Sequence, residues 1–376
     1  MCIRYDKEIR GYMTISEWIE QYQKGATESM DSLNILYLPC HATLEFDEIK
    51  LFTEMGHKVF SLQGSYTNPA NPADPKRPAI PTNIDPATYQ QLMYVTAQCS
   101  KDNIHEELIR WADVIFVSHR DDWILNNWKN MKHKQVVWRT IGQSVPQTEN
   151  RLALCRTEGL KIVRYSPMEK EISGYIGEDA MIRFYKDENE FCGWTGEEPS
   201  VITVCQSMKQ RDDACGYSIF QKGTKGLNAK LYGTQSLNAD MTPMDDPLWN
   251  GQLSYEDLKK AYRENAVYFC TGTYPSSYTL NFLEAFMTGI PVVAIGEALS
   301  DRPHYNIHAY EVSKIIVNGV NGYCSDDVKE LHEWTEMLLK DKVKAKEIGD
   351  AGRKTAIELF GKQTISNQWK VFFEQL

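Results

Sequence analysis

The sequence predicts an α/β protein built from two doubly wound, Rossmann-like domains that face each other across a cleft. Two observations lead to this prediction. The chain has 376 residues, more than one ordinary hydrophobic core contains. Short apolar runs also alternate with amphipathic stretches, which is typical of parallel sheets covered by helices on both faces. This alternation begins a second time near residue 200, so we expect two similar halves.

In the first half, the apolar runs predict five buried strands. A helix is expected at 46–55, ending at Gly56, and a proline-rich loop spans 69–86. Each run is bounded by turn-forming or polar residues, as buried parallel strands usually are. The predicted strands are 33–41, 57–64, 112–119, 134–142 and 160–166.

The stretch 193–200 interrupts this pattern and is interpreted as a linker. We therefore predict a first domain at 1–196 and a second domain at 197–362, with a final helix at about 363–376 packing back onto the first domain. Helices are expected at 326–340 and 342–360. The strands predicted in the second domain are 200–207, 229–234, 266–272, 290–296 and 314–319.

Charge and cysteine content narrow the classes of function. The chain carries 41 Lys and Arg against 51 Asp and Glu, a net charge of -10, whereas proteins that depend on phosphate-backbone contacts usually have the opposite balance. Nucleic acid is thus disfavoured as the default partner, although a local basic groove is compatible with this total. The nine cysteines form no CxxC pair, which is typical of free thiols in a reducing compartment. No apolar run has the length of a signal peptide or a membrane span, so we expect a cytoplasmic protein; nothing in the sequence specifies an oligomeric state.

Ligands of open α/β sheets bind beyond the carboxyl ends of the strands. The segment 274–296 lies at such a position. Pro275 with Ser276 or Ser277 is expected to form the turn and N-cap of a helix that ends at Gly289. In that helix Glu284 falls about 40° from Leu280 on the packed face, and a buried carboxylate needs a partner.

Two interpretations of Glu284 stay open. It is satisfied by a backbone amide or a lysine, or it accepts hydrogen bonds from sugar hydroxyls of a ligand. In the second case Ser276, Ser277 and Thr279 present the helix N-terminus to a phosphate group.

The segment EAFMTGIPVVA, residues 284–294, resembles the EAMA-x-G-x-PVVA segment of GT-B fold glycosyltransferases, especially the retaining family-4 (glycosyl transferases group 1) type. The resemblance covers about residues 200–360. It implies a nucleotide-diphosphate sugar as donor substrate, with Glu284 on the nucleotide ribose. The family's second Glu, eight positions earlier, faces the donor sugar; here that position is Ser276, which leaves the identity of the sugar open.

In that family, an Arg and a Lys after the first strand of the second domain hold the diphosphate. This chain offers Lys209 and Arg211 in CQSMKQR, and later Lys222 and Lys225 in KGTKG. The spacing differs from the family's, and an ordinary solvated loop is the alternative. We assign diphosphate binding to the first pair, because two cations after a strand suit a diphosphate. The predicted donor-binding set is Lys209, Arg211, Gly233, Ser276, Ser277, Tyr278, Thr279 and Glu284.

The first half supplies the candidate catalytic and acceptor-side residues. His119 follows a predicted strand where the family often has a histidine, and is predicted to bind or polarise a hydroxyl; a structural histidine is the alternative. Asp47 is the second predicted catalytic residue. His41 and Glu45 are predicted on the acceptor side, because this loop borders the acceptor in GT-B enzymes. Glu45 and Asp47 also fit a pair of charges at a helix N-terminus.

No metal and no cofactor are expected. His304 and His308 have the i, i+4 spacing of a zinc pair, but the HExxH pattern and a third ligand are missing. The resemblance implies a metal-independent glycosyltransferase that moves a sugar to a hydroxyl of a carbohydrate or glycan acceptor with retention of configuration. Two alternatives stay open. One is a virus-type DNA glucosyltransferase acting on hydroxymethylated bases in a host cytoplasm, disfavoured by the charge. The other is a sugar-nucleotide epimerase or a non-catalytic sugar-nucleotide-binding protein.

Overall fold

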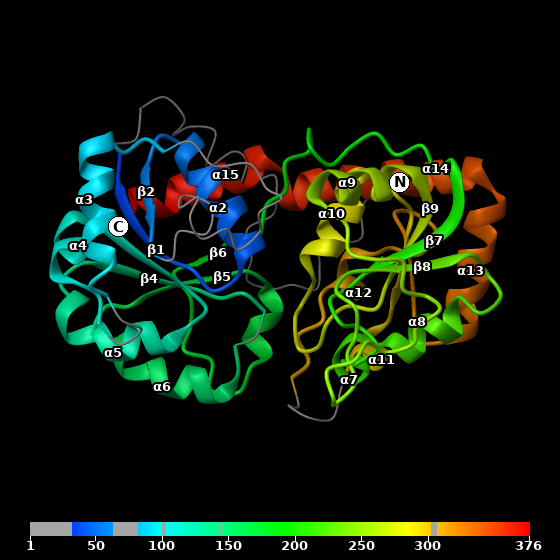
Figure 1. Ribbon diagram of the computed structural model, residues 1–376, viewed down its shortest axis with the longest axis horizontal. Coiled ribbons are helices and arrows are strands. Elements are labelled where there is room, and N and C mark those ends of the chain that lie inside the picture. The colour runs from blue at the N-terminus through cyan, green and yellow to red at the C-terminus, as the bar shows by residue number, and fades with distance from the viewer. Residues whose placement is uncertain (1–31, 63–81, 100–102, 143, 302–306) are drawn as a thin grey trace, which may run out of the picture. The chain divides into compact units, whose positions relative to one another are not determined.

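The computed structural model describes residues 32–62, 82–99, 103–142, 144–301 and 307–376. It contains two parallel sheets with helices between their strands (Figure 1), which confirms the predicted fold class. Within these residues, no helix combines the length and the apolar character needed to cross a bilayer. Most of the predicted proline-rich loop, and His304, lie outside the described residues.

The first sheet has the strand order β2-β1-β3-β4-β5-β6, and all of its pairings are parallel. Every residue of β3 is buried, as expected for a strand covered on both faces. The strands are β1 (Asn34–Leu38), β2 (Lys58–Ser61), β3 (Val114–Ser118), β4 (Gln135–Arg139), β5 (Lys161–Arg164) and β6 (Ala180–Met181). The helices are α2 (Ala42–Glu54), α3 (Pro86–Thr96), α4 (Glu106–Trp111), α5 (Asp121–Met131), α6 (Pro146–Thr157) and the 3₁₀ turn η1 (Pro167–Glu171).

The second sheet has the strand order β11-β10-β9-β7-β8, again with parallel pairings. Its strands are β7 (Glu198–Val204), β8 (Ala229–Tyr232), β9 (Asn265–Cys270), β10 (Val292–Ile295) and β11 (Tyr323–Ser325). Its helices are α7 (Asp212–Cys215), α8 (Tyr217–Gly223), α9 (Tyr255–Glu264), α10 (Leu280–Thr288), α11 (Glu297–Ser300), α12 (Val312–Ile315), α13 (Val328–Lys340) and α14 (Lys342–Phe360).

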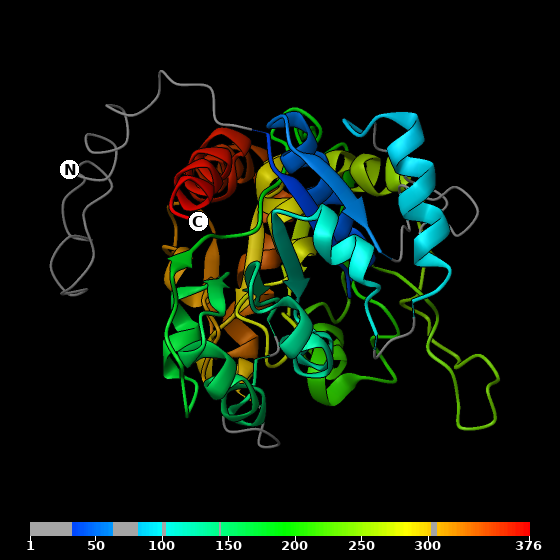
Figure 2. The same ribbon diagram turned by 90° about the vertical axis from the view of Figure 1, so that its left-hand side faces the viewer.

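The last helix, α15 (Lys362–Glu374), follows α14 and lies against the first sheet (Figures 1 and 2). Trp369 makes edge-on ring contact with Phe52 of α2, with the ring centroids 5.0 Å apart, and a tilted contact with Phe116 of β3 at 5.6 Å. Phe373 also contacts Phe52. The chain therefore contributes its C-terminal helix to the hydrophobic core of its first half.

One predicted strand is wrong. Residues 314–319 do not form a strand, and the edge strand of the second sheet is β11 instead. The reason is the side chain of Asn321, whose Oδ1 accepts from the backbone N–H of Val317 at 2.7 Å and whose Nδ2 donates to the carbonyl of Ile315 at 3.1 Å. An asparagine that bonds to the backbone of residues a few positions earlier favours a turn over an extended run.

A second difference concerns the first helix. The sequence places its start at residue 46, but α2 begins at Ala42. His41 is the N-cap, and its Nδ1 accepts from the backbone N–H of Leu44 at 3.5 Å. Glu45, predicted before the helix, therefore lies inside it together with Asp47.

Candidate functional site

The carboxyl ends of β7 and β9 lie next to the N-terminus of α10. The Asn281 side chain, in the first turn of α10, donates to the carbonyl of Val204 at the end of β7, at 2.7 Å. Behind β9, Thr271 Oγ1 donates to the carbonyl of Cys215 at 2.6 Å, and the Tyr274 N–H donates to the carbonyl of Ala214 at 2.8 Å. The side chain of Arg211 bonds to the carbonyl of Gln206, so the segment that follows β7 and the start of α10 both lie at the carboxyl end of this strand.

The N-terminus of α10 has the properties of an anion site. Thr279 is the N-cap, and its hydroxyl accepts from the Phe282 N–H at 3.2 Å; neither Ser276 nor Ser277 fills this role. The first amides of the helix, those of Leu280 and Asn281, have no acceptor within the helix by geometry alone. Together with the helix dipole, such amides attract a phosphate.

Ser276, Ser277 and Tyr278 contact the first half of the chain instead. The Ser277 N–H donates to the Tyr165 hydroxyl at 2.7 Å, and the Tyr278 hydroxyl donates to the Tyr165 carbonyl at 2.9 Å. A Cβ atom on Gly142, after β4, would lie 3.0 Å from Ser276 Oγ. In this arrangement Ser277 and Tyr278 are engaged within the chain, which leaves the anion-binding role to the amides that follow them.

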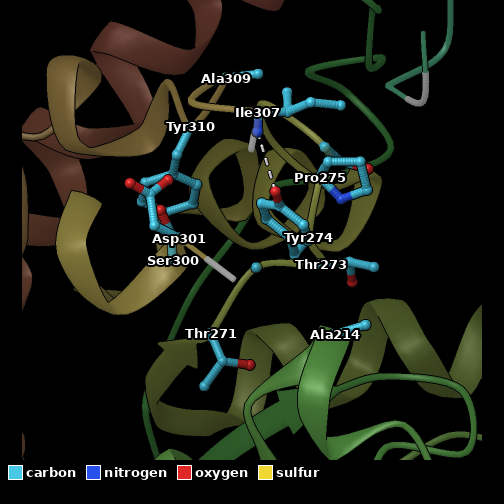
Figure 3. Close-up of a pocket in the computed structure, with 12 residues that line it drawn as sticks. Ala214, Thr271, Thr273, Tyr274, Pro275, Ser300, Asp301, Ile307, Ala309 and Tyr310 are labelled. Atoms are coloured by element: carbon cyan, nitrogen blue, oxygen red, sulfur yellow. Dashed lines mark hydrogen bonds between the residues drawn. The ribbon is translucent and has the colours of Figure 1, made fainter. Parts of the chain in front are cut away.

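A pocket opens beside this helix, at the carboxyl ends of β9 and β10 (Figure 3). Across it, the Tyr274 hydroxyl accepts from the Ile307 N–H at 3.1 Å, drawn as the dashed line. At its rim Asp301 pairs with His308 at 2.6 Å. Its open volume of about 10 Å³ is that of one water molecule. Its polar lining comes from Thr271, Thr273, Tyr274, Ser276, Ser300 and Asp301.

The two predicted cations differ in their availability. The Lys209 Nζ donates to the carbonyl of Asp245 at 2.5 Å and lies 5.6 Å from the Tyr217 ring centroid. Arg211 is exposed, and its guanidinium makes one hydrogen bond, of 3.3 Å, to the carbonyl of Gln206 in its own turn. Arg211 therefore has donors left to offer a diphosphate.

The alternative cations lie elsewhere. Lys222 belongs to the last turn of α8, and Lys225 follows in the connection to β8. Both precede the strand, so they sit toward its amino end. Ligands of such sheets bind at the opposite edge.

Gly233, predicted to bind the donor, has a structural requirement of its own. Its φ is +142°, and a Cβ atom there would lie 2.1 Å from the carbonyl oxygen of Cys205. No side chain fits into that space. The glycine therefore allows the chain to leave β8 in close contact with the end of β7.

Glu284 and Asp47, predicted to bind donor ribose and to act in catalysis, meet at one lysine. Lys186 Nζ lies 2.7 Å from Glu284 Oε1 and 2.8 Å from Asp47 Oδ2, and its side chain is only 1% exposed. The Tyr262 hydroxyl donates to the other oxygen of Glu284 at 3.3 Å. Of the two interpretations left open for Glu284, the structure shows the one with a lysine partner. The ion pair also engages Asp47, which in this arrangement is not a free base.

The other first-half candidates lie at the carboxyl ends of β1 and β3. His41 is exposed at the N-cap of α2. Glu45 is buried and accepts from the Ser61 hydroxyl at 2.5 Å, so its carboxylate points into the protein rather than toward an acceptor.

His119 has a different environment. It adopts a φ of +58°, and its buried Nδ1 has no hydrogen-bond partner among the described residues. Burial lowers the pKa of its imidazole, against the opposing charge of Asp121. The ring is thus neutral near pH 7 and able to accept a proton.

Several residues that organise this region gave no signal in the sequence. Lys186 joins partners 139 and 98 positions away, and a single lysine among other polar residues is not distinctive. Tyr165 looks like an ordinary strand-end tyrosine, yet it contacts Ser277 across 112 positions. Such long-range pairs follow from the packing of the two halves, which periodicity does not reveal.

Among the described residues, no group of three or more potential ligands is arranged to hold a metal ion. His308 is paired with Asp301, and His304 lies outside the described residues.

Comparison with known proteins supports the fold. No protein-family model matches the chain, and no curated protein matches it. Solved structures do. A glycosyltransferase from Rickettsia africae ESF-5 has 13% sequence identity and a TM-score of 0.63, with 92% of this chain and 99% of that chain covered. Anabaena Alr3699/HepE in complex with UDP-glucose has 14% identity and a TM-score of 0.62, with 92% and 100% covered. An alpha-glucosyltransferase in complex with UDP-glucose and DNA containing an abasic site has 12% identity and a TM-score of 0.56, with 92% and 99% covered. The chain therefore has the GT-B fold of these glycosyltransferases, and it spans almost their whole length.

Proposed function

We propose that the protein is a glycosyltransferase that moves a sugar from a nucleotide-diphosphate donor to a hydroxyl of an acceptor, with retention at the anomeric carbon. One observation carries the proposal. The exposed Arg211, which bonds to the Gln206 carbonyl, and the first turn of α10, which bonds to the Val204 carbonyl, both lie at the carboxyl end of β7. A cation and a helix N-terminus side by side make a site for a diphosphate.

The chemistry needs little more from the second half. The bond between the anomeric carbon and the diphosphate oxygen breaks, and the acceptor oxygen forms the new bond to that carbon. Arg211, the helix amides and Lys209 (once its ammonium leaves the Asp245 carbonyl) stabilise the charge that develops on the departing diphosphate. In this role they replace a metal ion, so we propose a metal-independent reaction.

The first half supplies the acceptor side. The neutral imidazole of His119 donates its N–H to the oxygen of the acceptor hydroxyl and so orients it, and the hydroxyl proton passes to the leaving phosphate. Exclusion of water when both substrates are bound favours transfer over hydrolysis.

UDP-glucose is the first donor to test, because two of the similar structures were solved with it. A ligand that binds the folded state stabilises it, by about 2.7 kcal/mol at a concentration of 100 times its Kd. The melting temperature rises as a result. We expect UDP-glucose to do so, with and without EDTA. Arg211→Met removes most of this shift, whereas Lys225→Met, at the amino end of β8, keeps it. If neither UDP-, GDP- nor ADP-sugars shift the melting temperature, the proposal is wrong.

Product analysis separates the remaining classes. A transferase releases UDP and leaves the sugar on an acceptor. An epimerase produces an altered sugar that is still attached to the nucleotide. A binding protein leaves the nucleotide sugar unchanged. DNA is retained as a second acceptor class because a similar structure contains it, although the net charge of -10 disfavours it. Duplex DNA binding that falls steeply with salt would support it.

A further inference from the structure

His119 is held in an unusual backbone conformation by two consecutive residues of β4. Its N–H donates to the carbonyl of Arg139 at 2.8 Å, and its own carbonyl accepts from the indole Nε1 of Trp138 at 2.9 Å. Its φ of +58° lies in the left-handed region. A residue other than glycine is uncommon in that region and persists only where its surroundings hold it there.

The two anchors are not equivalent. The contact with Arg139 joins two main-chain groups and continues the pairing of β3 with β4. The contact with Trp138 comes from a side chain that is fully buried and that packs 5.3 Å from the guanidinium of Arg164. Because the peptide groups on both sides of His119 are fixed, the direction of its Cα–Cβ bond is fixed as well.

The imidazole lacks the usual device for orienting a reactive histidine. That device is a carboxylate or carbonyl hydrogen-bonded to the second ring nitrogen. Here the buried Nδ1 has no partner among the described residues. The charged groups that act on the ring, Asp121, Arg120 and Asp122, come from the start of α5, and the first of these shares an ion pair with Arg151 of α6 at 3.1 Å.

We propose that Trp138 is a positioning residue: its indole N–H holds the His119 carbonyl and thereby aims the imidazole at the acceptor hydroxyl. The inference rests on the proposed function for the role of the ring, but its geometric part stands alone. Without the indole donor, the backbone of His119 relaxes toward the extended conformation and the ring turns away from its buried position.

The test compares Trp138→Phe with Trp128→Phe. The control removes an indole hydrogen bond of 2.6 Å to Glu158, at the other end of α5. Nitrogen-15 NMR of labelled histidines follows the titration of His119 in the ligand-free protein. Burial lowers this pKa in the wild type, so Trp138→Phe should raise it toward the ordinary value, and the control should leave it unchanged.

UDP release from UDP-glucose, with maltose as the hydroxyl-bearing probe, gives the functional arm. Trp138→Phe should lower kcat roughly tenfold, the usual effect of losing a group that orients a reactive side chain, with the KM for UDP-glucose unchanged. His119→Asn is the second variant, because asparagine accepts the left-handed region and keeps the carbonyl for Trp138. It should fold with the wild-type melting temperature and lose the same activity.

The outcomes are distinguishable. An unchanged His119 titration in Trp138→Phe, or full kcat in His119→Asn, overturns the inference. If UDP-glucose neither binds nor turns over, the proposed function fails, and the titration still decides whether Trp138 sets the environment of His119. If Trp138→Phe does not fold, His119→Asn decides: normal stability with lost turnover supports the role of the ring, and retained turnover refutes it.

Discussion

Replacing Lys186 with methionine tests the interpretation of the buried ion-pair cluster. Lys186 is 1% exposed, and it lies 2.8 Å from Asp47 and 2.7 Å from Glu284. The substitution removes the positive charge that both buried carboxylates contact. Breaking a buried ion pair on one side costs about 3–5 kcal/mol, and we expect the free energy of unfolding of Lys186→Met to fall by that amount.

The measurement is urea unfolding followed by circular dichroism and tryptophan fluorescence. Lys50→Met is the matched control, since Lys50 also pairs with two carboxylates, Asp187 and Glu190, but is 21% exposed. It should lose no more than about 1 kcal/mol. A Lys186→Met variant that is as stable as the control would refute this account of the cluster.

A triple variant separates a structural role from a donor-binding role. Asp47→Asn, Lys186→Met and Glu284→Gln together remove all three charges, and we expect most of the lost stability to return, because an uncharged replacement of a buried ion pair is often neutral. Glu284→Gln alone should leave the affinity for UDP-glucose within about twofold. A loss of roughly tenfold or more (about 1.4 kcal/mol) would instead place Glu284 on the nucleotide ribose, as the family resemblance implied.

Three further predictions concern stability. Burial raises the pKa of Glu169 to about 7, so between pH 4.5 and 7 the folded protein keeps a proton that the unfolded chain releases, and the contribution of Glu169 to the free energy of unfolding should fall with rising pH by up to about 3 kcal/mol. Burial lowers the pKa of His57 to about 4, so the contribution of His57 should rise with pH between 4 and 6.5 and offset much of that fall in the wild type. In melting curves across this range, Glu169→Gln should gain stability relative to the wild type as the pH rises, and His57→Gln should gain stability relative to the wild type as the pH falls. Gly233→Ala places a Cβ 2.1 Å from the Cys205 carbonyl oxygen and should lower the free energy of unfolding in urea by at least about 2 kcal/mol. The control is Gly226→Ala, where φ is also positive but nothing lies within 4 Å, and it should cost about 1 kcal/mol. Equal losses in the two variants would contradict the packing argument.

Much of the architecture follows from hydrophobic periodicity. All ten predicted strands are short apolar runs, and nine of them are strands in the structure. The exception, 314–319, is apolar enough for a strand but is followed by an asparagine whose side chain bonds back to Val317. A local hydrogen bond overrides the pattern there, and the hydropathy of the run contains no sign of it.

The side-chain contacts of the candidate site are harder to predict from hydrophobic periodicity. The sequence places His119 after a strand, and in the structure it directly follows β3. Side-chain direction is another matter. Glu45 lies two residues from Asp47, and the two bond to different partners, Ser61 and Lys186. Which way a carboxylate points depends on the start of its helix, and α2 begins four residues before the expected position.

The family resemblance assigned Glu284 by its place in a motif, and motif position does not specify a partner. In the structure that partner is Lys186, from the connection between the two sheets. The same motif correctly located the helix α10 and its C-terminal glycine, whose φ is +89°. The motif therefore predicted the backbone of this segment correctly, but it did not predict the side-chain partner of Glu284.

A crystal structure of the protein with UDP bound tests the central claim most directly. The account predicts that the diphosphate lies at the carboxyl edge of the second sheet, with its oxygens within hydrogen-bond distance of the Arg211 guanidinium and of the amides of Leu280 and Asn281. A nucleotide bound at the edge of the first sheet, or one whose phosphates touch neither Arg211 nor the N-terminus of α10, would contradict it.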